Sequence, residues 1–168
     1  MAVTDWLTPA GKRLADLRKM LEQNPSVYVG VLDSGKGSED RGGLTNGMLA
    51  VIHEFGQGRS PARPWISATF DRVRARTERN ARVLVERILD GAIGVEQALG
   101  VIGATFAADI KATVVGGEQI PPPNAPSTLE RKLAKTRAGS SGDPRTLVDT
   151  GRMLGAVSWL VDMLGSRR

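Results

Sequence analysis

Two long apolar stripes with helical spacing follow one another in the middle of the chain, and they constrain its fold most. The first stripe ends at Gly91 and consists of Phe70, Val73, Thr77, Ala81, Leu84 and Ile88. The second stripe has the same spacing and consists of Val95, Leu99, Ile102, Phe106, Ile110 and Val114. Because only a short link separates them, we expect two long helices that pack antiparallel.

The second of these helices carries small residues that would let another element approach its backbone closely: Gly100, Gly103, Ala104 and Ala107. A shorter helix is expected near the N-terminus. Thr8 is a suitable N-cap, Pro9 fits the first helical position, and Asn24-Pro25 should end the helix. Its leucines form one narrow stripe, which predicts docking by one face.

Three segments are predicted to be strands. Residues 27–32 alternate valines with other side chains, and residues 157–163 alternate in the same way. The apolar run from Met48 to Phe55, ended by Gly56, is predicted to form an open hairpin with the first strand. The fold class is therefore α+β, a single domain over residues 1–168: a small antiparallel sheet packed against two long antiparallel helices plus an N-terminal helix.

Two segments lie outside this predicted core. Residues 33–46 are rich in glycine and charge and are expected to be a mobile loop that orders against a neighbour. Residues 116–146 are expected to be an excursion with an extended proline-rich part and a short basic helix. Ser127 and Glu130 have the spacing of a capping box at the start of that helix.

The residue inventory argues against an enzyme. The chain has no cysteine and a single histidine, His53, so thiolate chemistry and sites that need two histidines are excluded. The segment from Gly30 to Lys36 has phosphate-loop spacing, but Gly37 replaces the hydroxyl residue that would hold magnesium. His53-Glu54 resembles the start of a zinc-protease motif, but Gln57 occupies the second histidine position. We predict no catalytic residues, metal or cofactor.

The net charge of +5 comes from one arginine-rich segment. Residues 59–87 contain eight arginines and three acids, so their surplus equals that of the whole chain. Arg72, Arg76 and Arg79 are expected on a helix face opposite the apolar stripe. Such a face can be solvated, bind an acidic protein surface, or contact nucleic acid. No aromatic residue lies between Arg72 and Arg79 for base stacking.

No secretory signal is visible at the N-terminus, and no run approaches the roughly 20 apolar residues that cross a bilayer. We therefore expect the protein in the cytoplasm of the cell that produces it, with no membrane partner.

Three short motifs in order resemble a known family. They are Ile52-His53-Glu54-Phe55-Gly56, then Pro61-Ala62-Arg63-Pro64-Trp65-Ile66, and a late block made of residues 123–128, Lys132 and residues 147–153. Together they resemble the virion-morphogenesis and tail-completion proteins, the minor neck components of tailed bacteriophages. The resemblance covers roughly residues 45–160.

The resemblance implies a structural virion protein that forms a ring at the neck, joins the head connector to the tail, and lets DNA pass without sequence readout. Its implied partners are other copies of itself (six, or alternatively twelve), a connector or adaptor, and a tail tube or terminator. The resemblance does not distinguish between a neck adaptor, a tail-completion factor and a tail terminator. The alternative function is a nucleic-acid-binding accessory protein. The predicted interface residues are Asp33, Lys36, Glu39, Asp40, Arg41, Arg72, Arg76 and Arg79.

Overall fold

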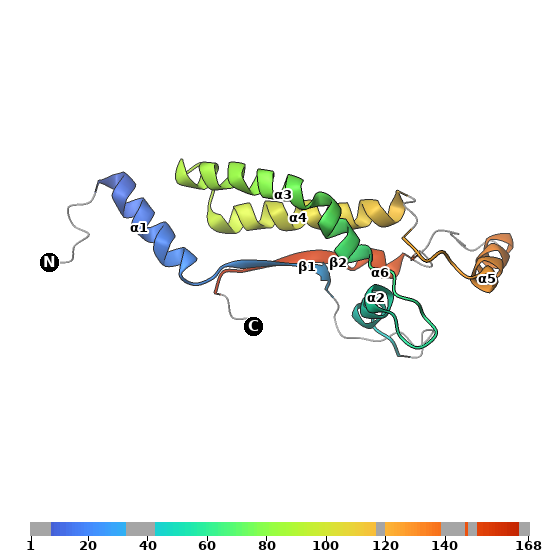
Figure 1. Ribbon diagram of the computed structural model, residues 1–168. Helices are drawn as coiled ribbons and strands as arrows, with labels where there is room; N and C mark the ends of the chain where they lie inside the picture. The colour runs from blue at the N-terminus through green and yellow to red at the C-terminus, as the bar shows by residue number, and fades with distance from the viewer. Residues whose placement is uncertain (1–7, 33–42, 117–119, 139–146, 148–150, 165–168) are drawn as a thin grey trace.

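The computed structural model describes residues 8–32, 43–116, 120–138, 147 and 151–164 (Figure 1). The molecule is elongated, with a helical hairpin and a two-stranded ribbon along its length. Its elements in chain order are α1 (Pro9–Leu21), β1 (Ser26–Val31), α2 (Asn46–Phe55), α3 (Trp65–Leu89), α4 (Val95–Val115), α5 (Pro126–Arg137), α6 (Arg152–Gly155) and β2 (Val157–Asp162).

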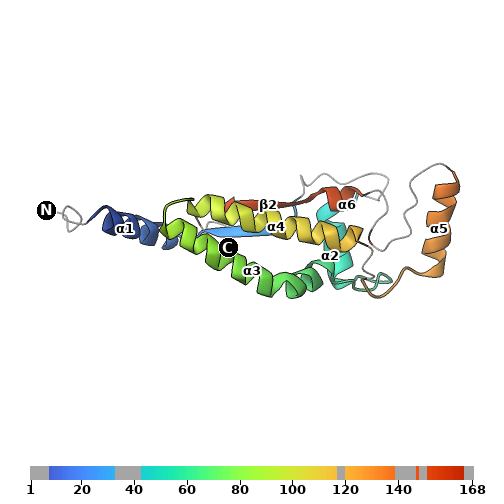
Figure 2. The ribbon, with the colours of Figure 1, turned by 90° about the horizontal axis from the view of Figure 1, so that it is seen from above.

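The long helices α3 and α4 pack side by side and antiparallel, which confirms the prediction from the two stripes (Figure 2). Gly91, with φ +76°, turns the chain at the end of α3, a backbone conformation that glycine adopts without steric cost. Val73 and Leu84 are buried on α3, as are Ala98 and Ile110 on α4. The hairpin therefore has an aliphatic interior.

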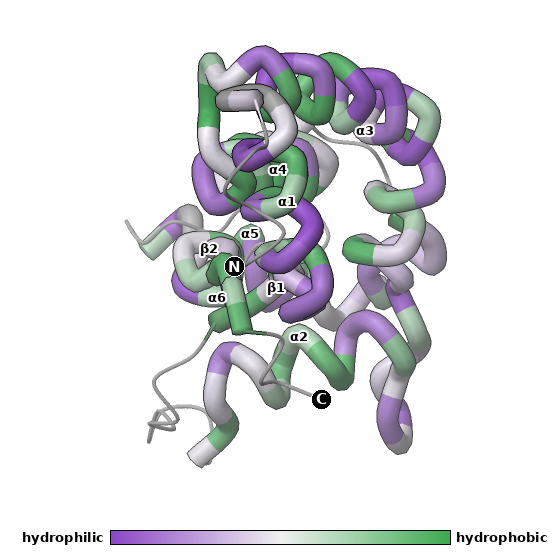
Figure 3. Tube along the Cα trace, turned by 90° about the vertical axis from the view of Figure 1, so that its left-hand side faces the viewer, coloured by the Kyte–Doolittle hydropathy of each residue, from purple (hydrophilic) through white to green (hydrophobic). Residues whose placement is uncertain are grey.

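The strands β1 and β2 form an antiparallel ribbon in which Val31 pairs with Val157 and Ser26 with Asp162. The ribbon lies against α4, so that α3, α4 and the ribbon are successive layers (Figure 3). A Cβ atom at Gly103 would lie 2.7 Å from Val27 and 2.8 Å from the Trp159 ring. The expected close approach to α4 is thus confirmed at Gly103, and the α+β class is confirmed as well.

The predicted strand from Met48 to Phe55 is wrong, because this segment is the helix α2. The Thr45 hydroxyl accepts a hydrogen bond of 3.1 Å from the Met48 backbone N–H, and Gly56, with φ +76°, ends the helix. Capping residues at both ends make this run of ten residues a complete helix. A short apolar run by itself does not distinguish a helix from a strand. The predicted hairpin of residues 27–32 with 48–55 is therefore also wrong, and β1 pairs with β2.

The helix α1 extends from the end of the molecule where the α3–α4 hairpin turns (Figure 1). As predicted, Thr8 caps it, accepting a hydrogen bond of 3.2 Å from the Gly11 backbone N–H. The Arg13 guanidinium donates a hydrogen bond of 2.8 Å to the Ile88 carbonyl and covers the space beside Gly91. Through Arg13, α1 is anchored to the hairpin turn.

The helix α5 lies at the opposite end of the molecule, and it confirms the short basic helix predicted after the proline-rich stretch. It begins at Pro126, one residue before the predicted cap, so Ser127 lies inside its first turn. Gly151 occupies the N-cap position of the short helix α6, which precedes β2.

The main core lies where α2, α3, α4, α6 and β2 meet. Trp65 and Ile110 are completely buried there. The cluster consists of Ala50, Trp65, Ala107, Ile110, Val114, Ile120, Met153 and Val157. It joins segments as far apart in the chain as residues 50 and 157.

By length and composition alone, α4 could cross a membrane, with a mean hydropathy of 1.5 over its most apolar stretch. This was not expected from the sequence, because Glu96, Asp109 and Lys111 interrupt the apolar run. In the fold, α4 lies between α3 and the ribbon, the position of a core helix.

Candidate functional surfaces

The junction between α2 and α3 is built on a buried carboxylate. Glu54, at the end of α2, accepts hydrogen bonds of 3.0 Å from the backbone N–H groups of Ile66 and Ser67 and a further bond from the Ser67 hydroxyl. No side chain caps α3 from its own N-cap position, Pro64. Glu54 therefore satisfies the free N–H groups and places a negative charge at the positive end of α3.

The strand predicted from Met48 to Phe55 would have placed Glu54 near the end of a strand, and this is wrong. Glu54 is 7% exposed, because the helical backbone of α2 directs it toward α3. The chain between the two helices folds back tightly. The Arg63 N–H donates to the His53 carbonyl, at 2.6 Å, and a Cβ at Gly56 would lie 2.8 Å from the Ala62 nitrogen.

The Arg63 guanidinium connects this junction to the proline-rich segment. Its Nε donates to the Pro122 carbonyl at 2.8 Å, and its Nη2 donates to the Pro123 carbonyl at 3.2 Å. Arg63 is 8% exposed. The three phage-like sequence motifs are thus brought together in space. Glu54 of the first motif accepts a hydrogen bond from Ser67, directly after the second motif. Arg63 of the second motif binds the proline-rich start of the late block, and Met153 of the late block packs in the core with Trp65.

The predicted outward arginine face of α3 needs correction. The Arg72 guanidinium donates to the Thr113 hydroxyl of α4, and Arg76 forms an ion pair with Asp109 of α4. Both side chains therefore contact α4 of the same chain. The expectation that they point away from the core is wrong. Long arginine side chains at the edge of a buried stripe can reach across to the neighbouring helix.

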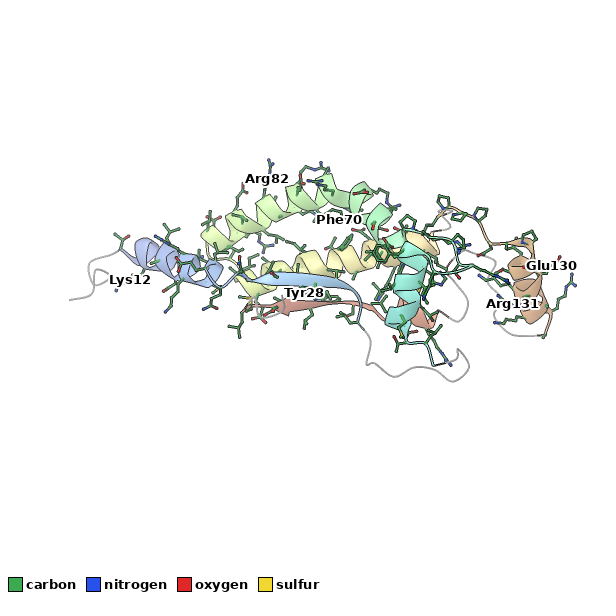
Figure 4. The ribbon with its side chains drawn as sticks, turned by 60° about the horizontal axis from the view of Figure 1, so that its bottom comes forward. Lys12, Tyr28, Phe70, Arg82, Glu130 and Arg131 are labelled. Atoms are coloured by element: carbon green, nitrogen blue, oxygen red, sulfur yellow. The ribbon has the colours of Figure 1, made fainter. Side chains whose placement is uncertain are left out.

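Arg79 matches the prediction of an outward side chain. It is exposed and makes no hydrogen bond or ion pair within the described part of the chain. Arg82 is also exposed and points away from α4 (Figure 4). The loop residues predicted to contribute to the interface lie outside the described residues: Asp33, Lys36, Glu39, Asp40 and Arg41.

The helix α2 carries an exposed apolar stripe. Met48, Val51 and Phe55 are 53%, 58% and 74% exposed, and their spacing of three and four residues places them on one side of the helix. A stripe of large apolar side chains open to water marks an interaction surface. The sequence contained this helical spacing, but interpreting the segment as a strand concealed it.

An apolar groove of about 650 Å³ lies between α1 and the α3–α4 hairpin. Leu14, Leu17 and Leu21 of α1 form one wall, and Leu84 and Leu99 belong to the other. Leu14 and Leu21 remain 57% exposed, so the groove is open to solvent. The narrow stripe predicted for the first helix thus faces a space that the described residues of its own chain do not fill.

Among the described residues, no group of three or more His, Cys, Asp or Glu side chains could hold a metal ion. Comparison with family models, with curated proteins and with solved structures gave no match.

Proposed function

We propose that this chain is a structural virion protein of a tailed phage, which assembles into a ring at the neck and joins the head connector to the tail. The observation that carries the proposal is a pair of unlike apolar surfaces on one molecule. The exposed stripe of Met48, Val51 and Phe55 lies on α2, and the open groove beside Leu14 lies toward the end where α1 projects (Figure 1).

Two different surfaces that fit each other produce a head-to-tail contact between copies. When such a contact is repeated, the copies close into a ring if a whole number of equal rotations completes a full turn. The stripe consists of three apolar side chains and ends at Phe55. Apolar side chains of this size suit a groove lined by leucines and valines. We propose that α2 of each copy occupies the groove of the next, in a ring of six.

The ribbon offers a further contact between copies. A two-stranded ribbon has an unpaired edge on each strand, and its face away from α4 carries Tyr28 and Leu32, 36% and 44% exposed. Unpaired edges readily add a strand from another chain.

Convergence of the three phage-like motifs at the junction of Glu54, Arg63 and Met153 also supports the proposal, because it gives those short motifs a shared structural role.

The nucleic-acid alternative has less support. It relied on an arginine face on α3, and Arg72 and Arg76 of that face are engaged with α4. Binding of duplex DNA by Arg79 and its exposed neighbours would show a steep dependence on salt. Tight, salt-dependent binding of the isolated protein to random duplex DNA would favour this alternative.

The head-to-tail contact can be tested with two complementary variants. Phe55→Asp spoils the stripe and leaves the groove intact, whereas Leu14→Asp spoils the groove and leaves the stripe intact. Each variant alone should be monomeric in light scattering at concentrations where the natural chain forms rings. Their mixture should give dimers, because one good stripe can still meet one good groove. Leu133→Asp on α5, also at an exposed leucine, is the control and should still form rings.

The location of this chain in the virion is tested separately. Deleting the gene from its phage should give heads and tails that fail to join, or heads that leak DNA. A reconstruction of the intact particle should show this chain as a ring on the axis between head and tail. A single isolated copy, or a location away from the neck, would overturn the proposal.

A further inference from the structure

A second cavity, also of about 650 Å³, lies between the segment 57–64, the proline-rich segment and α5. Its charged lining is entirely basic among the described residues, since no Asp or Glu side chain contributes to it. The lining includes His53, Arg59, Arg63, Arg131, Lys132 and Lys135. Such a concentration of positive charge around a concave space favours a negatively charged occupant.

Part of this charge is withdrawn from water. Arg63 is 8% exposed. The Arg63 guanidinium is oriented by the carbonyl groups of Pro122 and Pro123, which are dipoles and do not neutralise its charge. Removing cations from water is costly unless a negative group compensates, so an anion in the cavity would stabilise this arrangement.

His53 gives a second, independent indication of an occupant. Its Nδ1 atom is buried and has no hydrogen-bond partner, which is rare for a buried polar atom. Burial, followed by the positive charges of Arg63 and Lys132, lowers the pKa of His53, so its ring is neutral at pH 7. A neutral imidazole with its proton on Nδ1 can donate one hydrogen bond to a ligand oxygen.

The uncharged walls indicate the kind of anion. Pro61, Pro122, Pro123 and Leu147 are apolar, and the described part of the lining contains no Phe, Tyr or Trp on which a nucleobase could stack. Aliphatic walls suit the backbone and methylene groups of a peptide. Guanidinium groups such as those of Arg59 and Arg131 match carboxylates with two parallel hydrogen bonds.

We propose that this cavity binds an acidic peptide segment of a partner protein, with Asp or Glu carboxylates directed toward the basic lining and the aliphatic parts of the peptide against the prolines. The exposed Arg59 and Arg131 would meet the carboxylates first. This surface is separate from the α2 stripe and the α1 groove, so the inference does not depend on ring formation.

The test uses the full chain and a fluorescein-labelled peptide of alternating Glu and Ala, followed by fluorescence anisotropy at low salt. The matched peptide with Gln in place of Glu should bind at least about tenfold more weakly. A thymidine oligonucleotide of equal charge should also bind more weakly than the Glu peptide. At pH 7, the Glu peptide should shift the ring resonances of His53, the sole histidine of the chain.

The pair Arg59→Glu and Arg131→Glu should weaken binding of the Glu peptide at least about tenfold, with an unchanged circular dichroism spectrum. The control pair Arg79→Glu and Arg82→Glu on α3 changes the net charge equally and should leave affinity within about twofold. The proposal is overturned by equal binding of the Gln peptide, by tighter binding of the oligonucleotide, or by an equal loss in the control pair.

Discussion

The carboxylate of Glu54 accepts a hydrogen bond from the Ser67 backbone N–H at 3.0 Å, across 13 positions of the chain. This bond joins the last turn of α2 to the first turn of α3. Because a helix N-terminus attracts negative charge, Glu54 fixes the direction in which α2 leaves the junction. The exposed stripe that ends at Phe55 is thereby held in a defined orientation to the helical hairpin.

Replacement of this carboxylate should therefore reduce stability. We expect Glu54→Gln to lower the free energy of unfolding by about 1–3 kcal/mol, because the amide keeps an acceptor oxygen but loses the charge and one acceptor. Urea unfolding followed by circular dichroism measures the change. Glu86→Gln, at an exposed site on α3, is the control and should lie within about 0.5 kcal/mol of the natural chain. Equal effects at the two sites would contradict the capping role.

The contact of the ribbon with α4 provides a second prediction. Gly103→Ala adds a methyl group within 3 Å of Val27 and Trp159, which should force the ribbon outward and lower the free energy of unfolding by about 1–3 kcal/mol. Gly100→Ala is the matched control on the same helix, with no atom near the added methyl group. It should raise stability by about 0.5–1 kcal/mol, because alanine favours a helix. The prediction fails if the two variants change stability in the same direction.

The long elements were predictable from sequence because their signals are local. The periodicity of α3 and α4, the cap at Thr8, and the alternation of β1 and β2 each specify their own segment. The segment from Met48 to Phe55 shows the limit. It is short and mostly apolar, and both helix and strand can produce such a run. The capping residues Thr45 and Gly56 are the signals that distinguish a helix from a strand here. They are useful only if the ends of the segment are assigned before its apolar interior.

Contacts between distant segments were less accessible. Glu54 reaches the N-terminus of α3 because α2 is a helix, so the strand interpretation also gave Glu54 the wrong environment. Arg76 was assigned outward from its position relative to Val73, yet its side chain is long enough to reach Asp109. Periodicity specifies where a side chain leaves the backbone, and the neighbouring helix decides where its charged end binds.

The ion pair between Arg76 and Asp109 can be measured directly. Arg76 is 48% exposed, so its replacement by alanine should cost only about 0.2–1 kcal/mol of unfolding free energy. Arg76→Glu should cost more, because it places a second negative charge beside Asp109. Adding Asp109→Arg to Arg76→Glu should recover most of that loss by reversing the pair. Urea unfolding of the natural chain, Arg76→Glu, Asp109→Arg and the double variant completes the cycle, and absence of recovery would contradict a stabilising role for the pair.

His53 should make stability depend on pH. In the folded chain, burial and then the charges of Arg63 and Lys132 lower the pKa of His53 from its ordinary value of 6.5. Below pH 6.5 the unfolded chain therefore binds a proton that the folded chain does not, so the free energy of unfolding falls as pH decreases. Above that value the imidazole is neutral in both states, and its contribution to pH dependence disappears.

We expect the loss of stability between about pH 7.5 and pH 5 to be smaller in His53→Gln than in the natural chain, by up to about 1.4 kcal/mol for each pH unit between the two pKa values. Urea unfolding of both chains at both pH values gives this difference, and it cancels any change in stability that is independent of pH. Because His53 is the sole histidine, its ring proton resonance can be followed without assignment. A titration midpoint at or above 6.5 in the folded chain would contradict the prediction, since an accessible or anion-paired imidazole would keep its proton.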